Sequence, residues 1–186
     1  MTTGPGRVEP RLRLATGADR EAISALMKAS TRDLFPAFYD QRQTASSVEY
    51  IAHIDPVLID DRTYYVAEVD GDLVACGGWS RRDKLFSGTS EQEGRDRLLD
   101  PASEAARIRA MFVRGDWARR GLGTRILEAC QSAARAEGFT RLSLMATLPG
   151  FPLYRRFGFH ETGREVLTLP DGVCVEAVSM EMPIAP

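Results

Sequence analysis

The sequence contains few of the residues that build metal sites and disulfide frameworks. Its three cysteines, Cys76, Cys130 and Cys174, are odd in number and far apart, and no CxxC pair occurs. Its two histidines, His53 and His160, are equally isolated. The sequence therefore predicts no metal site. We interpret the three cysteines as buried thiols of a protein in a reducing compartment.

Long apolar runs and a strong excess of one charge are also missing. No run reaches the roughly 18 apolar residues that span a membrane. The N-terminal segment MTTGPGRVEPRLRL has no apolar stretch typical of a signal peptide. The net charge of −2 and the pI of about 5.8 give no basic excess of the kind that nucleic-acid binders carry. We therefore expect a cytoplasmic protein that binds neither a membrane nor nucleic acid.

The chain length of 186 residues suits a single domain. Apolar residues make up 44% of the chain and charged residues 27%, the balance of a globular protein that buries a core without disulfides. Gly4, Pro5, Gly6 and Pro10 predict a flexible tail over residues 1–10. Residues 11–186 then form the predicted domain.

Apolar periodicity predicts an alternation of strands and helices. Strands are expected at residues 11–14, 63–69, 73–79, 107–113, 141–145, 165–169 and 173–182, and helices at 18–30, 31–53 with a break near Pro36, 120–137 and 152–157. Residues 81–103 are expected to form a loop or a short helix near 91–99. The strand, helix and strand within 107–145 form a right-handed crossover unit, which makes these two strands parallel. The predicted fold class is α/β (or α+β), with a mixed central sheet of six to seven strands flanked by about four helices.

The segment MFVRGDWARRGLGTRILEAC carries the clearest chemical signal. A strand ends there, Gly121 and Gly123 follow, and a helix begins. Glycine lets a ligand approach the backbone closely, and the first turn of a helix offers unpaired N–H donors at the positive end of its dipole. This pattern predicts a phosphate or pyrophosphate site, to which Arg119, Arg120 and the Thr124 hydroxyl add charge and a hydrogen bond. On local grounds alone, glycines that only pack the helix start are an equally good interpretation.

In its context this segment resembles the acyl-CoA pocket of the GNAT superfamily of N-acetyltransferases, whose signature is [QR]-x-x-G-x-[GA]. The matching window is ARRGLG, residues 118–123, in which Ala118 stands where the family usually has Gln or Arg. The upstream MFV, residues 111–113, resembles the family's bulged central strand, which binds the pantetheine arm. The downstream PLYRRFGF, residues 152–159, resembles its FYxxxGF element.

The resemblance implies a single N-acetyltransferase domain with acetyl-CoA as co-substrate and no metal. The acetyl group would pass to a primary amine of a small molecule or a peptide N-terminus, by direct attack in a ternary complex. The residues implied to bind acetyl-CoA are Met111, Phe112, Val113, Arg119, Arg120, Gly121, Leu122, Gly123 and Thr124.

The same resemblance implies catalytic roles for individual residues. A backbone N–H at Phe112 or Val113 would stabilise the developing oxyanion. Tyr154, the tyrosine of the matched downstream element, is the implied general acid for the leaving thiolate, and core packing is the alternative role for its ring. Glu104 and Asp83 are candidates for the base that takes the proton of the amine, and a water relay would need neither.

The acceptor amine is expected to bind opposite the cofactor in the resembled fold. The expected lining consists of Phe35, Phe38, Tyr39, Trp79 and residues 81–103. Clustered aromatic residues more often belong to a core, so packing in the hydrophobic core is the alternative role for these aromatic residues.

Arg107 and Arg109 occupy the middle of the predicted central strand, where many family members have a glutamate. Both fall on one face, because strand side chains alternate. A buried arginine needs a partner, and a structural carboxylate is one interpretation. The alternative is that one of the two binds an anionic group of the acceptor, and Arg109 is the candidate.

Two other functions remain open at this stage. A non-catalytic module that senses acetyl-CoA or serves as a scaffold would keep the same binding turn without a role for Tyr154. An unrelated α/β domain would use the glycines for packing alone. The final strand at residues 173–182 is also expected to leave an edge that pairs with a second copy, so a homodimer is one candidate assembly.

Overall fold

The computed structural model describes residues 9–87 and 95–184. Its seven strands form one mixed sheet in the order β1-β2-β3-β4-β5-β7-β6. The strands are β1 (Arg11–Leu14), β2 (Tyr64–Val69), β3 (Asp72–Ser80), β4 (Ala106–Val113), β5 (Arg141–Thr147), β6 (His160–Thr168) and β7 (Cys174–Pro183). The helices are α1 (Arg20–Leu34), α2 (Gln41–Tyr50), α3 (Pro56–Asp60), α4 (Leu122–Ala136) and α5 (Phe151–Phe157). Short 3-10 turns are η1 (Gly17–Asp19), η2 (Phe35–Ala37) and η4 (Gly115–Trp117).

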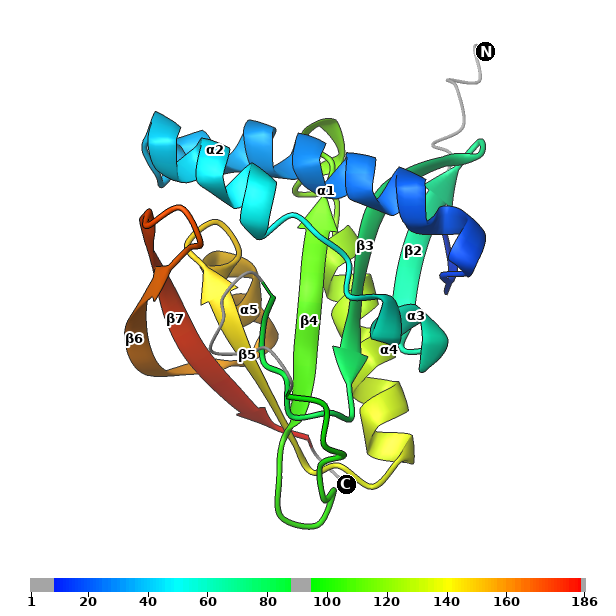
Figure 1. The fold of residues 1–186 in the computed structure, drawn as a ribbon. Helices are drawn as coiled ribbons and strands as arrows, with labels where there is room; N and C mark the ends of the chain where they lie inside the picture. The colour runs from blue at the N-terminus through cyan, green and yellow to red at the C-terminus, as the bar shows by residue number, and fades with distance from the viewer. Residues whose placement is uncertain (1–8, 88–94, 185–186) are drawn as a thin grey trace.

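Helices cover both faces of the sheet (Figure 1). α1, α2 and α3 lie on one face, and α4 and α5 lie on the other. The apolar stripe of α4 packs against β3 and β4 because its buried positions recur every three or four residues. Ile126 at the centre of this stripe is fully buried, and its truncation to alanine is worth about 2–5 kcal/mol of stability. This packing fixes the start of α4 relative to the end of β4.

The predicted order of strands and helices is confirmed, and the predicted α/β class with a mixed sheet holds. α3 was not predicted. Asp55 caps it by accepting a hydrogen bond from the Val57 N–H at 3.3 Å, and Pro56 occupies its first position. The single helical region expected over 31–53 is instead the end of α1, the η2 turn and α2.

The segment between β3 and β4 is extended where the structure describes it. Arg82 and Leu98 form an isolated antiparallel bridge. The short helix considered near 91–99 is therefore wrong over residues 95–99, and residues 91–94 lie outside the described residues. Residues 1–8 of the expected N-terminal tail lie outside them as well.

β4 and β5 separate along their length, and this separation creates the site described below. Their parallel pairing is confined to Ala106 with Leu142 and Arg107 with Ser143. Beyond these pairs the two strands diverge, as Figure 1 shows. Beyond Arg107, β5 consequently does not pair with the backbone edge of β4.

β7 lies between β5 and β6, so the expected edge at residues 173–182 is wrong. The outer strand is β6, which is mostly exposed. The homodimer therefore stays a prediction, and β7 does not support it because β7 is not an edge strand. Cys76 and Cys130 are buried as expected, whereas Cys174 is exposed because it opens β7 next to the β6–β7 turn.

Within residues 9–87 and 95–184, no helix combines the length and apolar character needed to cross a bilayer. The same residues contain no group of three or more His, Cys, Asp and Glu side chains arranged to hold a metal ion.

Candidate active site

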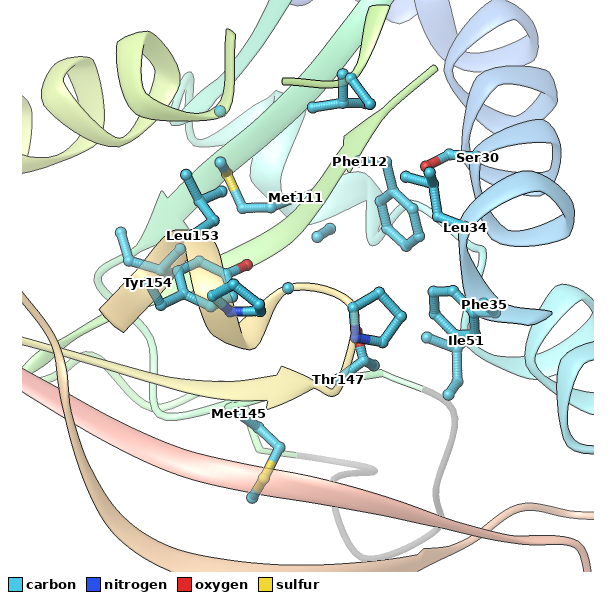
Figure 2. A pocket seen from close by; sticks show the side chains of 18 of the residues that line it. Ser30, Leu34, Phe35, Ile51, Met111, Phe112, Met145, Thr147, Leu153 and Tyr154 are labelled. Atoms are coloured by element: carbon cyan, nitrogen blue, oxygen red, sulfur yellow. The ribbon is translucent and has the colours of Figure 1, made fainter. Parts of the chain in front are cut away.

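A cavity of about 490 Å³ lies where β4 and β5 diverge. This volume is within the range of sites that bind small ligands and cofactors. Its walls come from α1, the second half of β4, the turn before α4, the end of β5 and the start of α5. Figure 2 shows Met111 and Tyr154 on one side of the cavity, and Phe35, Ile51 and Phe112 on the other. The cavity thus connects the α4–α5 face of the sheet with the α1–α2 face.

The turn before α4 presents backbone donors to this cavity. Arg119 and Gly121 both have positive φ angles, +64° and +83°, which turn the chain sharply into the helix. The Arg125 N–H donates to Gly121 O at 3.0 Å, so the N–H groups of the three preceding residues have no acceptor one helical turn earlier. These residues, 122–124, all line the cavity. The geometry suits an anion at the positive end of the helix dipole.

The two glycines of this turn have different surroundings. A Cβ on Gly121 would meet nothing within 4 Å, whereas a Cβ on Gly123 would lie 2.7 Å from Leu153 Cδ2. Gly123 therefore allows α5 to approach α4, and the packing interpretation applies to it. Gly121 leaves open space beside its backbone, which is the property that close approach of a ligand requires.

Not every residue predicted to bind acetyl-CoA lines the cavity. Met111, Phe112, Val113 and Arg119 do, together with residues 121–124. Arg120 instead places its guanidinium over the ring of Trp117, 4.6 Å from the ring centroid, and it does not line the cavity. Its interaction with Trp117 is a cation–π contact.

β4 carries a bulge where it passes the cavity. Arg109 lies opposite Gly78 and Phe112 opposite Cys76, so two residues of β4 face one residue of β3. The extra residue gives Ala110 a positive φ of +51°, and a bulge leaves part of the backbone without a partner strand. The bulge that the family resemblance implied is thus present in this strand.

Tyr64 holds the bulge from the α1 face. Its hydroxyl donates to Ala110 O at 2.6 Å, and the side chain is fully buried. Burial raises the pKa of Tyr64 well above its ordinary value, so the hydroxyl remains a donor. The bond satisfies a carbonyl that the sheet does not.

Beyond the bulge, the direction of the backbone can be followed from one bond. The Arg114 N–H donates to Val74 O on β3 at 2.9 Å. Because successive N–H groups of a strand point to opposite edges, the Val113 N–H points to the open edge that faces β5. Of the two oxyanion donors considered, this geometry favours Val113 over Phe112.

Tyr154 on α5 contributes both to the core and to the cavity. Its ring packs edge-on against Phe159, with 5.9 Å between ring centroids. Gly150 makes room for the ring, since a Cβ there would lie 2.9 Å from Tyr154 Cε2. Its hydroxyl points into the cavity, near Met111 (Figure 2). Burial raises the pKa of Tyr154 above its ordinary value, so the phenol is protonated at neutral pH.

The two carboxylates proposed as bases are not brought to the cavity, and this part of the prediction is corrected. Glu104 accepts two hydrogen bonds from Arg97, at 2.9 and 2.7 Å, and one from the Asp100 N–H. These bonds lower the pKa of Glu104 to about 2. Asp83 accepts from the Arg97 N–H at 3.1 Å. Both lie near the beginning of β4, whereas the cavity is at its end.

Among the side chains of the cavity lining that could accept a proton, sequence reasoning missed two, Asp33 on α1 and His53 after α2. His53 contacts Glu49 O through Nε2. Neither residue belongs to a recognisable motif, and their approach to β4 depends on how α1 and α2 pack over the sheet.

Only some of the residues expected to bind the acceptor line the cavity. Phe35 and Phe38 line the cavity. Tyr39 does not, because its hydroxyl donates to Glu176 O at 2.6 Å and accepts from the Leu148 N–H at 2.9 Å. It therefore joins the start of α2 to β7 and to the end of β5, and its assignment to the acceptor site is corrected.

Trp79 is corrected as well. It is 1% exposed and packs edge-on against Phe139 in the core beneath α4, 6.0 Å between ring centroids. β3 turns this side chain to the α4 face, so it cannot reach the acceptor half of the cavity.

Arg109 lines the cavity, and Arg107 does not. Arg109 donates to Asp55 Oδ2 at 3.3 Å, to Lys84 O at 3.0 Å and to Ser87 Oγ at 3.0 Å. Arg107 donates to Ser143 Oγ at 2.5 Å. A structural carboxylate is thus the partner of Arg109 but not of Arg107. Burial lowers the pKa of both arginines, although a guanidinium stays charged in proteins.

Comparison with known proteins identifies the same family as the sequence motifs do. A family model described as "Acetyltransferase (GNAT) family" matches residues 25–159. No curated protein sequence matches the chain. Among solved structures, a GCN5-related N-acetyltransferase from Rhodopseudomonas palustris is 19% identical, with 94% of this chain and 96% of that chain covered and a TM-score of 0.71.

Two further solved structures contain coenzyme A. PaiA N-acetyltransferase from Thermoplasma acidophilum, in complex with coenzyme A, is 12% identical over 94% of this chain and 98% of that one, with a TM-score of 0.63. N-acetylglutamate synthase from Neisseria gonorrhoeae, complexed with coenzyme A and N-acetyl-glutamate, is 16% identical over 97% of this chain and 36% of that one, with a TM-score of 0.61. At these identities the structural similarity shows the fold.

Proposed function

Because this chain belongs to the acetyltransferase (GNAT) family, we propose that it transfers an acetyl group from acetyl-CoA to a primary amine. The acceptor is a small molecule or a peptide N-terminus, and the amine attacks the thioester directly while both substrates are bound. One observation carries the proposal. A single cavity joins the open first turn of α4, the bulged edge of β4 and the Tyr154 hydroxyl.

The residues around the cavity fit the chemistry of acetyl-CoA. The N–H groups of residues 122–124, with Arg119 and the Thr124 hydroxyl, suit the pyrophosphate. The unpaired edge of β4 suits the amide groups of the pantetheine arm, since these need backbone donors and acceptors. Acetyl-CoA supplies the thioester carbon that the amine attacks. The protein stabilises the developing charge and moves the protons.

Backbone groups of β4 stabilise the charge that develops on the thioester oxygen. The Val113 N–H and the amides freed by the bulge are fixed by the sheet and by the Tyr64 bond to Ala110 O. A preorganised donor of this kind lowers the activation barrier by about 3 kcal/mol. The sheet geometry supports this role because the donors need not reorganise during the reaction.

Tyr154 donates its proton to the departing thiolate. Its raised pKa keeps the phenol protonated at neutral pH, and its hydroxyl points into the cavity (Figure 2). Since Glu104 and Asp83 are held by Arg97, the proton of the amine goes to water in the cavity or to Asp33 or His53, which line it.

A thiol-release assay with acetyl-CoA and a panel of amines tests the proposal. The wild-type chain should release thiol only when a suitable amine is present. Tyr154→Phe should reduce kcat by about 100-fold or more and leave the Kd of acetyl-CoA unchanged. Tyr65→Phe is the matched control, because Tyr65 is a half-buried tyrosine of β2 that does not line the cavity.

The outcomes separate the enzyme from a sensor. Tight binding of acetyl-CoA with no amine-dependent thiol release would favour a non-catalytic module. Equal kcat for the wild type and Tyr154→Phe would remove the proposed general acid. Failure to bind acetyl-CoA at all would refute the proposal.

A further inference from the structure

A cluster of charged residues, Arg109, Lys84 and Asp55, adjoins the half of the cavity opposite Tyr154, and of the three only Arg109 lines the cavity. The Arg109 side chain is 2% exposed and lines the cavity. Asp55 at the start of α3 and Lys84 after β3 approach it from two separate segments. The cluster lies on the face of the sheet that α1, α2 and α3 cover, where the acceptor would enter.

The cluster carries an excess positive charge. A single oxygen, Asp55 Oδ2, lies 3.3 Å from Arg109 Nη2 and 2.9 Å from Lys84 Nζ. Burial acts to raise the pKa of Asp55, but the Lys84 hydrogen bond and the Arg109 charge outweigh it and hold this pKa below its ordinary value. Asp55 is therefore ionised, and one carboxylate faces two cations. A buried charge without compensation is costly, so an anionic ligand would be stabilised here.

Arg109 also has donor capacity that the described residues do not use. Its guanidinium has five N–H groups. Three bonds, to Asp55, Lys84 O and Ser87 Oγ, are present. Three of the five N–H groups therefore have an acceptor among residues 9–87 and 95–184. A charge-assisted bond to a carboxylate is stronger than a bond to a neutral group.

The walls around this cluster are apolar. Leu34, Phe35 and Ile51 line the cavity on the same side, and Phe86 joins them from the segment after β3. Figure 2 shows Leu34, Phe35 and Ile51 grouped on the side of Phe112. An apolar group with a single anionic end matches such walls better than a fully polar ligand does.

We propose that the acceptor is a small amino-carboxylic acid with an apolar body, whose carboxylate binds at Arg109, with the nearby charge of Lys84 adding to the attraction. The proposal rests on the proposed function and names the substrate class of that same site. The cation and the bulge at Ala110 belong to one short stretch of β4. An α-amino acid, in which one carbon separates the amine from the carboxylate, suits this proximity along β4.

Matched acceptors test the charge directly. L-leucine, L-leucinamide and 3-methylbutylamine share one apolar body, and L-phenylalanine, L-phenylalaninamide and 2-phenylethylamine share another. In at least one trio, the amino acid should show kcat/KM about 10–100-fold above the amide and the amine, since a hydrogen bond to a charged group contributes a factor of that size. Equal or higher kcat/KM for the neutral amines in both trios would overturn the proposal.

Three variants assign the effect to the cluster. Arg109→Met should raise KM for the amino acid at least 10-fold without changing the Kd of acetyl-CoA. Lys84→Met should act in the same direction, and it removes a side chain that is 27% exposed, so the fold tolerates it if Arg109→Met does not fold. Arg107→Met is the control, because Arg107 is a half-buried arginine of the same strand that does not line the cavity. Unchanged KM in Lys84→Met, or equal effects in Arg107→Met, would refute the assignment.

A binding measurement keeps this proposal separate from the transferase activity. Titration calorimetry of 4-methylpentanoate or 3-phenylpropanoate into the CoA-saturated chain reports on the carboxylate site without turnover. Binding of either acid by the wild type and its loss in Lys84→Met would support the site, even if no amine were acetylated. Absence of binding for both acids would overturn it, even if neutral amines were acetylated.

Discussion

Gly121→Ala is the substitution that separates a ligand-binding glycine from a packing glycine. Gly121 has φ of +83°, and the position of its missing Cβ has no heavy atom within 4 Å. The space belongs to the edge of the cavity in front of the first turn of α4. A methyl group there meets no protein atom, but it would occupy the approach of a pyrophosphate to the N–H groups of residues 122–124.

The two effects of the substitution have different sizes. Placing alanine in the left-handed region costs about 1 kcal/mol, which lowers Tm by roughly 2–4 °C for a chain of this size. Displacing the ligand from one or two charge-assisted bonds costs about 1.5–3 kcal/mol each, equivalent to roughly a 10–100-fold or larger increase in the Kd of acetyl-CoA.

Gly172→Ala is the control for backbone strain. Gly172 has φ of +80° in the turn between β6 and β7, and it also has nothing within 4 Å of its missing Cβ. Both variants should lose similar Tm in a thermal unfolding experiment. In titration calorimetry with acetyl-CoA, only Gly121→Ala should bind more weakly. Wild-type affinity in Gly121→Ala would refute the assignment of this turn to the pyrophosphate.

Two further predictions concern β4 and Tyr154. Tyr64→Phe removes the 2.6 Å bond to Ala110 O, so urea unfolding should show a loss of about 0.5–1.5 kcal/mol and kcat should fall. Tyr65→Phe should change neither quantity. Unchanged kcat in a folded Tyr64→Phe would separate the bulge from catalysis. Because burial raises the pKa of Tyr154 above its ordinary value of about 10, this acid keeps its proton through the alkaline range, and kcat measured between pH 6 and pH 10 should show no decrease caused by its ionisation. A decrease near pH 8 that disappears in Tyr154→Phe would contradict that role.

Local sequence signals predicted the parts of the fold that depend on neighbouring residues. The apolar stripe of α4 follows from spacing along one helix. The strands predicted at 63–69 and 73–79 leave a short connection, in which Asp70 and Gly71 have positive φ, +51° and +89°, as a tight hairpin requires. The glycines before α4 were also visible in the sequence, although the different surroundings of Gly121 and Gly123 were not.

The rest depended on contacts between distant segments. Asp55 and Arg109 are 54 residues apart in the sequence, and no motif connects them. Tyr39 reaches Glu176 O across 137 residues, so its structural role could not be distinguished from a role in the acceptor site. Glu104 was plausible from its place before the central strand, but only the folded chain shows that Arg97 holds it away from the cavity.

The most direct test of the account is a crystal structure of the chain with coenzyme A. The pyrophosphate should lie within about 2.7–3.2 Å of the N–H groups of residues 122–124, and the sulfur should lie beside the Tyr154 hydroxyl at the bulge of β4. Coenzyme A bound with its pyrophosphate away from the turn at Gly121, or with its sulfur outside the cavity between β4 and β5, would contradict the account.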